Sequence, residues 1–283
     1  MRAEEWAVAA TYHGEGPCWD PVVGKLRLVD QLAGNLLTFE PDTTHTRRHV
    51  GDVAAAWRPR AAGGLVVAVE RGFALVTPEG QVSPGNELWS DTTLRMNDGG
   101  CDPAGNFYCG TMAYDFGRDR ARVFRLTPEG DVSVVHSGAS LSNGLVWSLD
   151  GTFAYYVDTL AECVARVTVD PESGHFSTPE PWVTVDPGQG YADGLALDSE
   201  GGLWVALWKG GAVHRYTPDG VLDAVVEVNA RQVTACAFGG DDYSRLFITT
   251  SRLDIAPGDD PAAGTVFAVD PGVKGAAPLL FAG

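Results

Sequence analysis

The sequence predicts an all-β protein, a six-bladed β-propeller with a central channel. The first observation is one phrase that recurs six times along the 283 residues. In each copy a small or polar residue stands four positions before an apolar residue, a turn rich in Asp, Pro and Gly follows, and a run of alternating hydrophobics comes next. The copies are spaced by about 40 to 50 residues, which is the length of a four-stranded propeller blade.

The six copies share one register. Their first residues are Glu15, Val53, Asn97, Asn143, Asp193 and Thr234. The apolar residues that fix the alignment are Trp19, Trp57, Cys101, Trp147, Leu197 and Phe238. Repeated units that close on themselves bring equivalent positions together around one axis. We therefore expect the functional chemistry at the first position of the phrase.

The second observation is a turn phrase that follows each repeat. Residues 25–29, 202–207 and 245–249 alternate as strands do. The next predicted strand ends in Pro, an acid and Gly, as in LVTPEG, RLTPEG, VTVDPESG, RYTPDG and AVDPG, with LTFEPD as a weaker first copy. Pro and Gly preset the two backbone angles of a hairpin turn, so each unit is predicted to be an antiparallel meander.

These units occupy nearly the whole chain, which predicts a single domain over residues 1–283. The segment 4–11 forms no unit of its own, and we expect it to pair with the last blade and close the ring. A β-sandwich needs fewer internal copies, and a doubly wound α/β fold needs helical periods that the sequence lacks.

Charge and composition limit the partners. The net charge is −17 and no run of Lys or Arg occurs, which argues against nucleic acid or an anionic membrane as a partner. We expect a cytoplasmic protein with no membrane association, because no signal-peptide pattern or long apolar stretch is present. The six copies in one register predict a monomer or a weak homo-oligomer. The five Cys form no CxxC pair, so they are predicted to be core side chains in a reducing compartment.

The first positions of the phrase predict a metal site. Glu15, Asn143 and Asp193 converge in the expected register, and their oxygens are ligands that calcium, magnesium or manganese prefer. Asn97 occupies the same register and is interpreted as either a metal ligand or a substrate contact. Such residues also line water-filled channels or cap turns, and Asn-Gly and Asp-Gly pairs are common turn formers.

The motifs resemble those of the gluconolactonase and regucalcin-like family, also called the senescence marker protein family. The resemblance rests on HGEGPCWD, RMNDGGCDPAGNFYCGTM, LSNGLVWSLDGTFAYYVDT, YADGLALDSEGGLWVALWKGG and TACAFGGDDYSRLFITT, in that order. It implies one catalytic divalent metal held by Glu15, Asn143 and Asp193, with Arg95 and Asn97 binding a sugar lactone. Where family members often carry an acid after Thr-Met, this chain has Ala113, Tyr114 and Asp115, so Tyr114 and Asp115 are candidate rim residues.

The expected reaction is hydrolysis of an aldonolactone to the aldonic acid, which makes the protein a carboxylic ester hydrolase. A divalent metal polarises the ester carbonyl and activates water, and Asp193 is our candidate general base. Calcium is the first choice of metal, with zinc, manganese, magnesium and ferrous iron as alternatives. The choice among glucono-, xylono-, galactono- and arabinono-lactones stays open.

Two other functions fit the same pattern. An oxygen-ligated metal also polarises P=O, so the protein could be a metal-dependent phosphotriester or organophosphate hydrolase. A propeller can also be a non-catalytic calcium-binding scaffold, because fold does not fix function. A serine hydrolase is disfavoured, since no G-x-S-x-G occurs and only His13 lies beside a candidate motif.

Overall fold

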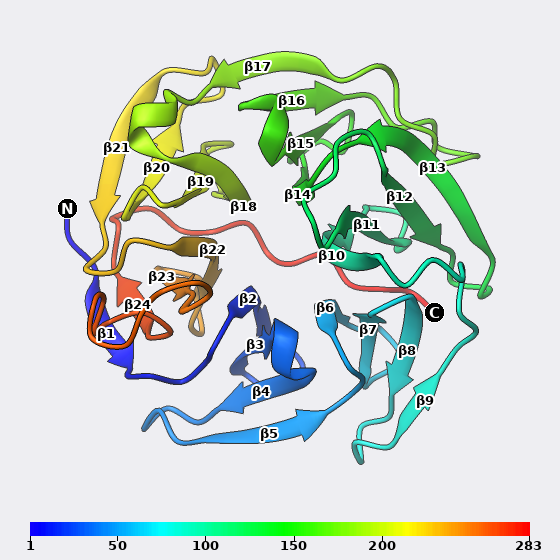
Figure 1. The fold of residues 1–283 in the computed structure, drawn as a ribbon, viewed down its shortest axis with the longest axis horizontal. Helices are drawn as coiled ribbons and strands as arrows, with labels where there is room; N and C mark the ends of the chain where they lie inside the picture. The colour runs from blue at the N-terminus through cyan, green and yellow to red at the C-terminus, as the bar shows by residue number, and fades with distance from the viewer.

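The computed structural model describes residues 1–283 and confirms the six-bladed β-propeller. Six four-stranded antiparallel sheets surround a central channel, and the first strand of each blade lies nearest the axis (Figure 1). Blade 1 comprises β2 (Gly14–Asp20), β3 (Lys25–Asp30), β4 (Asn35–Phe39) and β5 (His45–His49). Blade 2 comprises β6 (Ala54–Pro59), β7 (Leu65–Val69), β8 (Gly72–Val76) and β9 (Val82–Pro84). Blade 3 comprises β10 (Leu94–Cys101), β11 (Phe107–Ala113), β12 (Ala121–Leu126) and β13 (Val132–Ala139).

The second half of the chain repeats this pattern. Blade 4 comprises β14 (Ser142–Trp147), β15 (Ala154–Asp158), β16 (Cys163–Val167) and β17 (Glu180–Thr184). Blade 5 comprises β18 (Tyr191–Leu197), β19 (Leu203–Trp208), β20 (Ala212–Tyr216) and β21 (Leu222–Glu227). Blade 6 comprises β22 (Val233–Gly239), β23 (Arg245–Thr250), β24 (Val266–Val269) and the N-terminal β1 (Glu4–Ala7). Three single-turn 3₁₀ helices are η1 (Gln31–Ala33), η2 (Thr159–Ala161) and η3 (Pro187–Gln189).

The N-terminal segment closes the ring, as the sequence predicts. β1 pairs antiparallel with β24, and Glu5 lies opposite Phe267. The segment also contacts the preceding blade, because the Ala3 N–H donates to the Glu227 carbonyl at 2.9 Å. Blade 6 therefore consists of strands from both ends of the chain (Figure 1).

The register predicted from the repeat is confirmed strand by strand. Each of the six aligned apolar residues pairs with one of the first three residues of the second strand in its blade. The pairs are Trp19–Leu26, Trp57–Val67, Cys101–Phe107, Trp147–Ala154, Leu197–Leu203 and Phe238–Leu246. All six inner strands are also irregular at one level, at or just after the first position of the phrase. A β-bulge re-aims side chains, which makes this level of the channel different from the rest of each strand.

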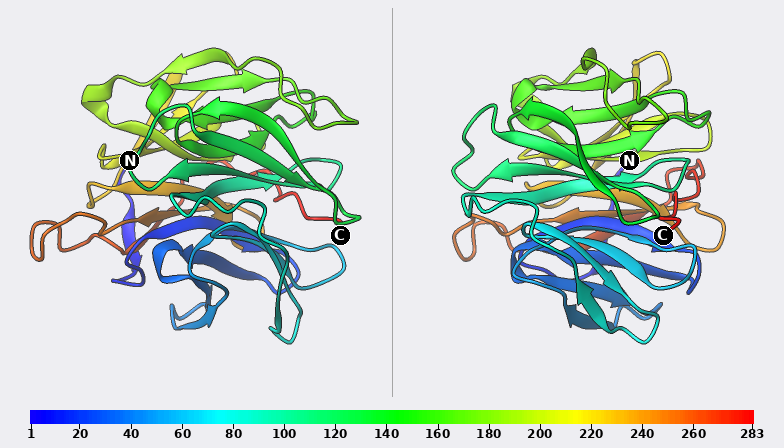
Figure 2. Two further views of the ribbon diagram at one scale, coloured as in Figure 1. Left: turned by 45° about the vertical axis from the view of Figure 1, so that its right-hand side comes forward. Right: turned by 90° about the vertical axis from the view of Figure 1, so that its right-hand side faces the viewer.

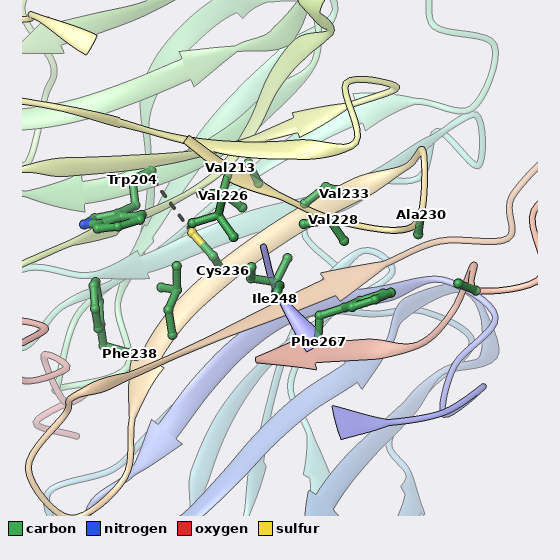
Figure 3. Packing of buried hydrophobic residues seen from close by; sticks show 14 residues of the cluster. Trp204, Val213, Val226, Val228, Ala230, Val233, Cys236, Phe238, Ile248 and Phe267 are labelled. Carbon is green, nitrogen blue, oxygen red and sulfur yellow. Dashed lines mark hydrogen bonds between the residues drawn. The ribbon is translucent and has the colours of Figure 1, made fainter. Parts of the chain in front are cut away.

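The hydrophobic core lies between neighbouring blades. Figure 3 shows the cluster between blades 5 and 6, where Trp204 and Val213 from one blade pack against Ile248 and Phe267 from the other. Cys236 lies in this cluster, consistent with a small core side chain. All five Cys are free thiols, and only Cys163 is not fully buried.

A C-terminal strap, residues 270–283, crosses one end of the channel (Figure 1). The Ala276 N–H donates to the Leu197 carbonyl at 3.0 Å, and the Phe281 N–H donates to the Pro59 carbonyl at 3.0 Å. Beneath the strap lies a cavity of about 510 Å³. Five of the six aligned apolar residues line it, namely Trp19, Cys101, Trp147, Leu197 and Phe238. No helix in the structure is both long enough and apolar enough to span a membrane.

Candidate functional site

The polar residues of the repeat lie at the channel end opposite the C-terminal strap. The first position of the phrase lies near the start of each inner strand, and the strand runs from there toward the strap. Figure 2 shows the strap (red) and the loop between β23 and β24 (orange) at opposite faces of the ring. That loop begins at Ser251, which forms an isolated antiparallel β-bridge with His13. His13 lies two residues before Glu15. The large cavity under the strap is therefore not the candidate site.

Close approach of the inner strands explains two glycines beside the predicted ligands. A Cβ on Gly194, next to Asp193, would lie 2.5 Å from the Ala235 Cβ of the neighbouring blade. A Cβ on Gly144, next to Asn143, would lie 2.7 Å from the Asp193 carbonyl oxygen. These contacts are too short for any side chain. The Asn-Gly and Asp-Gly pairs are therefore places where neighbouring bulged strands meet.

Asn97 and Asn143 contact each other directly. The Asn97 Nδ2 donates to the Asn143 Oδ1 at 2.9 Å, while the Asn143 Nδ2 donates to the Thr159 Oγ1 at 2.7 Å. The Thr159 hydroxyl in turn donates to the Ala192 carbonyl at 2.9 Å. This chain of bonds runs from blade 3 to blade 5 and fixes both amide groups. The Asn143 oxygen retains one lone pair for a further partner.

Glu15 and Asp193 supply buried carboxylates with few protein partners. Each residue is only 5% exposed. The Glu15 Oε2 accepts one long bond, 3.3 Å, from the Gly16 N–H, and the Asp193 carboxylate accepts none. Burial raises the pKa of Asp193 well above its usual range, and the charges of Glu15 and Asp98 raise it further. Burial and Asp98 likewise raise the pKa of Glu15.

Arg95 is a buried cation at the site. It is 4% exposed, and its Nη1 donates to the Met96 carbonyl at 3.0 Å and to the Asn97 Oδ1 at 2.8 Å. Burial lowers the pKa of Arg95 to about 10, which leaves it charged at neutral pH. Asn97 thus joins the guanidinium to Asn143.

The two candidate rim residues differ in their contacts. The Tyr114 ring lies over the Arg95 guanidinium, with 5.7 Å from Cζ to the ring centroid. The Asp115 carboxylate accepts from the Gly117 N–H at 3.0 Å and pairs with Arg120 at 3.4 Å, so its contacts stay within its own loop. The remaining register residues carry no charge. Val53 is apolar and buried, and the Thr234 hydroxyl donates to the Gly14 carbonyl at 2.6 Å.

Sequence reasoning missed Asp98, Thr159 and the position of His13. Asp98 shares the bulge of β10 with Asn97, and only the bulge brings both residues to the site. Thr159 follows the second strand of blade 4, and no local motif marks its contact with Asn143. His13 is buried, with its Nδ1 2.7 Å from the Ser251 Oγ and its Nε2 3.9 Å from the Glu15 Oε1. Burial and Arg95 lower the pKa of His13 to about 3, so the ring is neutral.

The donor set fits an oxygen-ligated divalent cation. No group of three or more His, Cys, Asp or Glu side chains is placed to hold a metal ion. The predicted set differs from such a group, since it has two carboxylates and takes its third oxygen from Asn143. Two buried carboxylates with almost no hydrogen bonds are costly unless a cation compensates them. Arg95 supplies one positive charge against the two carboxylates of Glu15 and Asp193, which leaves the site short of positive charge.

The sequence model of the protein family described as the SMP-30/Gluconolactonase/LRE-like region matches residues 13–252 of this chain. The chain belongs to this family. The SMP-30/gluconolactonase match covers every predicted site residue, from Glu15 to Asp193, together with all six inner strands.

Named members of the SMP-30/gluconolactonase family align over nearly their whole length. Regucalcin from Danio rerio is 36% identical, with 95% of each chain covered. Pentonolactonase XacC from Haloferax volcanii is 34% identical, with 93% of this chain and 92% of the relative covered. The crystal structure of a calcium-binding protein, regucalcin, from Agrobacterium tumefaciens superposes with a TM-score of 0.91 at 28% identity, covering 99% of this chain and 98% of that one.

Proposed function

We propose that this protein hydrolyses a sugar lactone to the aldonic acid with the help of one divalent metal ion. The observation that carries the proposal is the pair of buried carboxylates, Glu15 and Asp193, beside an amide oxygen of Asn143 that two hydrogen-bonding neighbours hold in place. A relative that covers nearly the whole chain is named a pentonolactonase, which supports a lactone as the substrate class.

Glu15, Asn143 and Asp193 are the residues proposed to hold the metal. A divalent ion bound there would polarise the lactone carbonyl and make water more acidic. Calcium is our first choice, because the ligands are all oxygens and an SMP-30/gluconolactonase relative of similar structure is named a calcium-binding protein. Zinc, manganese, magnesium and ferrous iron stay as alternatives.

Asp193 and Arg95 are proposed to act on the substrate. Asp193 accepts the proton of the attacking water and passes it to the ring oxygen as the C–O bond breaks, so the proton count balances. Arg95 donates to lactone oxygens from the guanidinium edge that has no protein acceptor. Asn97 orients both Arg95 and Asn143, which makes it a positioning residue with access to the substrate.

A non-catalytic calcium-binding role is the second candidate. Relatives and a structural neighbour carry the name regucalcin, and one of them is described as a calcium-binding protein. The same site would then hold calcium without turning over a substrate. The phosphotriesterase alternative keeps the metal and changes the reacting group from C=O to P=O.

One assay separates these functions. The metal-loaded protein is tested in a pH-stat with glucono-, xylono-, galactono- and arabinono-lactones and with a phosphotriester, each with and without a chelator. We expect acid release from at least one lactone that the chelator abolishes and added metal restores. Turnover of the phosphotriester alone would favour the second enzyme function, and metal binding without turnover would favour the calcium-binding protein.

A further inference from the structure

We propose that Tyr114 and Glu70 form a brace that positions the Arg95 guanidinium for the substrate. This inference rests on the proposed function, because it takes Arg95 as the residue that binds the lactone. The brace joins a loop of blade 2 to the inner strands of blade 3.

The first part of the brace is the tyrosine. The Tyr114 ring covers the Arg95 guanidinium at 5.7 Å, and its hydroxyl donates to the Glu70 Oε1 at 2.7 Å. An aromatic face over a guanidinium is attractive and restricts its rotation. The hydroxyl bond in turn fixes the ring, because a tyrosine held at both its face and its tip has little freedom left. Tyr114 therefore controls where the guanidinium lies.

Glu70 is itself firmly held. Its carbonyl accepts from the Met96 N–H at 2.8 Å, one residue from Arg95. Its second carboxylate oxygen pairs with the Arg71 Nη1 at 3.4 Å, and Arg71 also pairs with Glu87. The loop after β7 is therefore attached to β10 through its main chain and to Tyr114, just after β11, through the Glu70 side chain. Glu70 provides a fixed acceptor for the Tyr114 hydroxyl.

The arginine has a free edge that needs such support. Only Nη1 donates hydrogen bonds, whereas Nε is buried without a partner and Nη2 has no acceptor. A guanidinium anchored through one nitrogen can turn about that contact. The ring of Tyr114 blocks this motion and keeps the free edge available for lactone oxygens, which are acceptors of the kind that a forked guanidinium binds well.

Asp115 does not provide this support, although an acid near this position was a natural candidate. Its carboxylate is engaged by Gly117 and Arg120 within the loop that follows β11. The residue that reaches Arg95 is the neighbouring tyrosine. Of the two candidate rim residues, Tyr114 is therefore the one that contacts Arg95.

The test removes the brace without removing Arg95. Tyr114→Phe keeps the ring and loses only the bond to Glu70, so we expect KM for the best lactone to rise roughly three- to tenfold with kcat within about twofold, as for loss of one hydrogen bond. Tyr114→Leu also loses the ring and should raise KM further. Glu70→Gln keeps an acceptor and should stay closer to the wild type than Glu70→Ala.

A double-variant cycle tests whether the two residues act together. If they form one brace, Tyr114→Phe has no further effect on KM in a Glu70→Ala background. The matched control is Tyr243→Phe, because Tyr243 lies in the turn between β22 and β23 at the strap end and its hydroxyl makes no hydrogen bond. That variant should have wild-type KM and kcat.

Calorimetry provides the readouts that do not depend on turnover. We expect the brace variants to bind the aldonate product more weakly by a similar factor and to bind calcium as the wild type does. Wild-type KM and product affinity in Tyr114→Phe would overturn the brace, as would a parallel loss of calcium affinity and kcat, which would indicate general damage to the site. A wild-type protein that turns over no lactone would instead overturn the proposed function, and the brace with it.

Discussion

Substitutions of Asp193 and of Arg95 are expected to affect different properties, the first mainly kcat and the second mainly KM. Asp193→Asn keeps an amide oxygen as a ligand and loses the proton acceptor, so it should retain part of its metal while kcat falls by roughly 10² to 10⁴. Arg95→Lys should keep its metal and raise KM, because an ammonium cannot reproduce forked contacts. Metal content, KM and kcat are measured side by side. Near wild-type turnover by metal-loaded Asp193→Asn would place the base elsewhere.

The buried carboxylates also predict how the metal-free protein responds to pH. Burial raises the pKa of Glu15 from 4.5 to about 8 and raises that of Asp193 as well. Between pH 4.5 and about 8, the folded chain therefore binds more protons than the unfolded chain. The free energy of unfolding falls as pH rises through this range. Neutral His13 has the opposite effect, but only below its ordinary pKa of 6.5.

The measurable consequence is confined to pH 6.5 to 8, the part of that range above the ordinary histidine pKa. Without metal, Tm should be lower at pH 8 than at pH 6.5, and saturating calcium should raise Tm more at pH 8, where the ligands are closer to ionised. Glu15→Gln should reduce both effects. An equal calcium-induced shift at the two pH values would contradict this account of the carboxylates.

At the scale of the strand, the common irregularity of the inner strands is what assembles the site. Gly194 allows β18 to pass close to β22 beside Asp193, and an added Cβ would lie 2.5 Å from that of Ala235. Gly194→Ala should therefore lower the free energy of unfolding by about 1–3 kcal/mol, the usual cost of overpacking, and weaken metal binding.

A matched control separates crowding from the loss of a glycine. Gly188 lies in η3, and its nearest neighbour beyond the adjacent residues is the flexible Asp186 side chain at 3.2 Å. Gly188→Ala should change the free energy of unfolding and the affinity for metal only slightly. Chemical denaturation and calcium calorimetry on the two variants provide the comparison, and equal effects would show that the close approach of β18 and β22 is unimportant.

Much of the fold can be predicted from the sequence because the fold consists of repeated units. Six copies in one register predict the inner strands, the turns after the third strands and the convergence of Glu15, Asn143 and Asp193. Contacts between blades leave no such signal. Thr159 meets Asn143 after a complete strand, and Glu70 reaches Tyr114 from another blade, so neither contact follows from local spacing. The bulge that brings in Asp98 likewise appears only when two strands pair.

For the whole molecule, ring closure depends on a short N-terminal strand. β1 supplies the outer strand of blade 6, and the main chain of Ala3 also bonds to Glu227 in the preceding blade. Deleting residues 1–7 exposes the edge of β24 and the apolar surface beneath it. We expect Tm to fall by roughly 10 °C, because the loss of several kcal/mol in a chain of this size shifts Tm by a few degrees per kcal/mol.

A point variant tests the same closure with less disruption. Glu5→Pro removes a main-chain donor from β1 without shortening the chain, so it should show part of the deletion's effect. Val8→Ala changes an exposed side chain just outside the strand and serves as the control. A deletion variant that melts like the wild type would mean that the other strands hold the ring closed without β1.

Metal content, determined by elemental analysis of protein purified without chelator, tests the central claim most directly. The account predicts about one divalent ion per wild-type chain and a large loss in Asn143→Ala and Glu15→Gln, whose circular dichroism spectra should match the wild type. Asn97→Ala, which removes a neighbour of Asn143, should lose less metal than Asn143→Ala. Full metal occupancy in folded Asn143→Ala and Glu15→Gln would contradict the assignment of these residues as ligands.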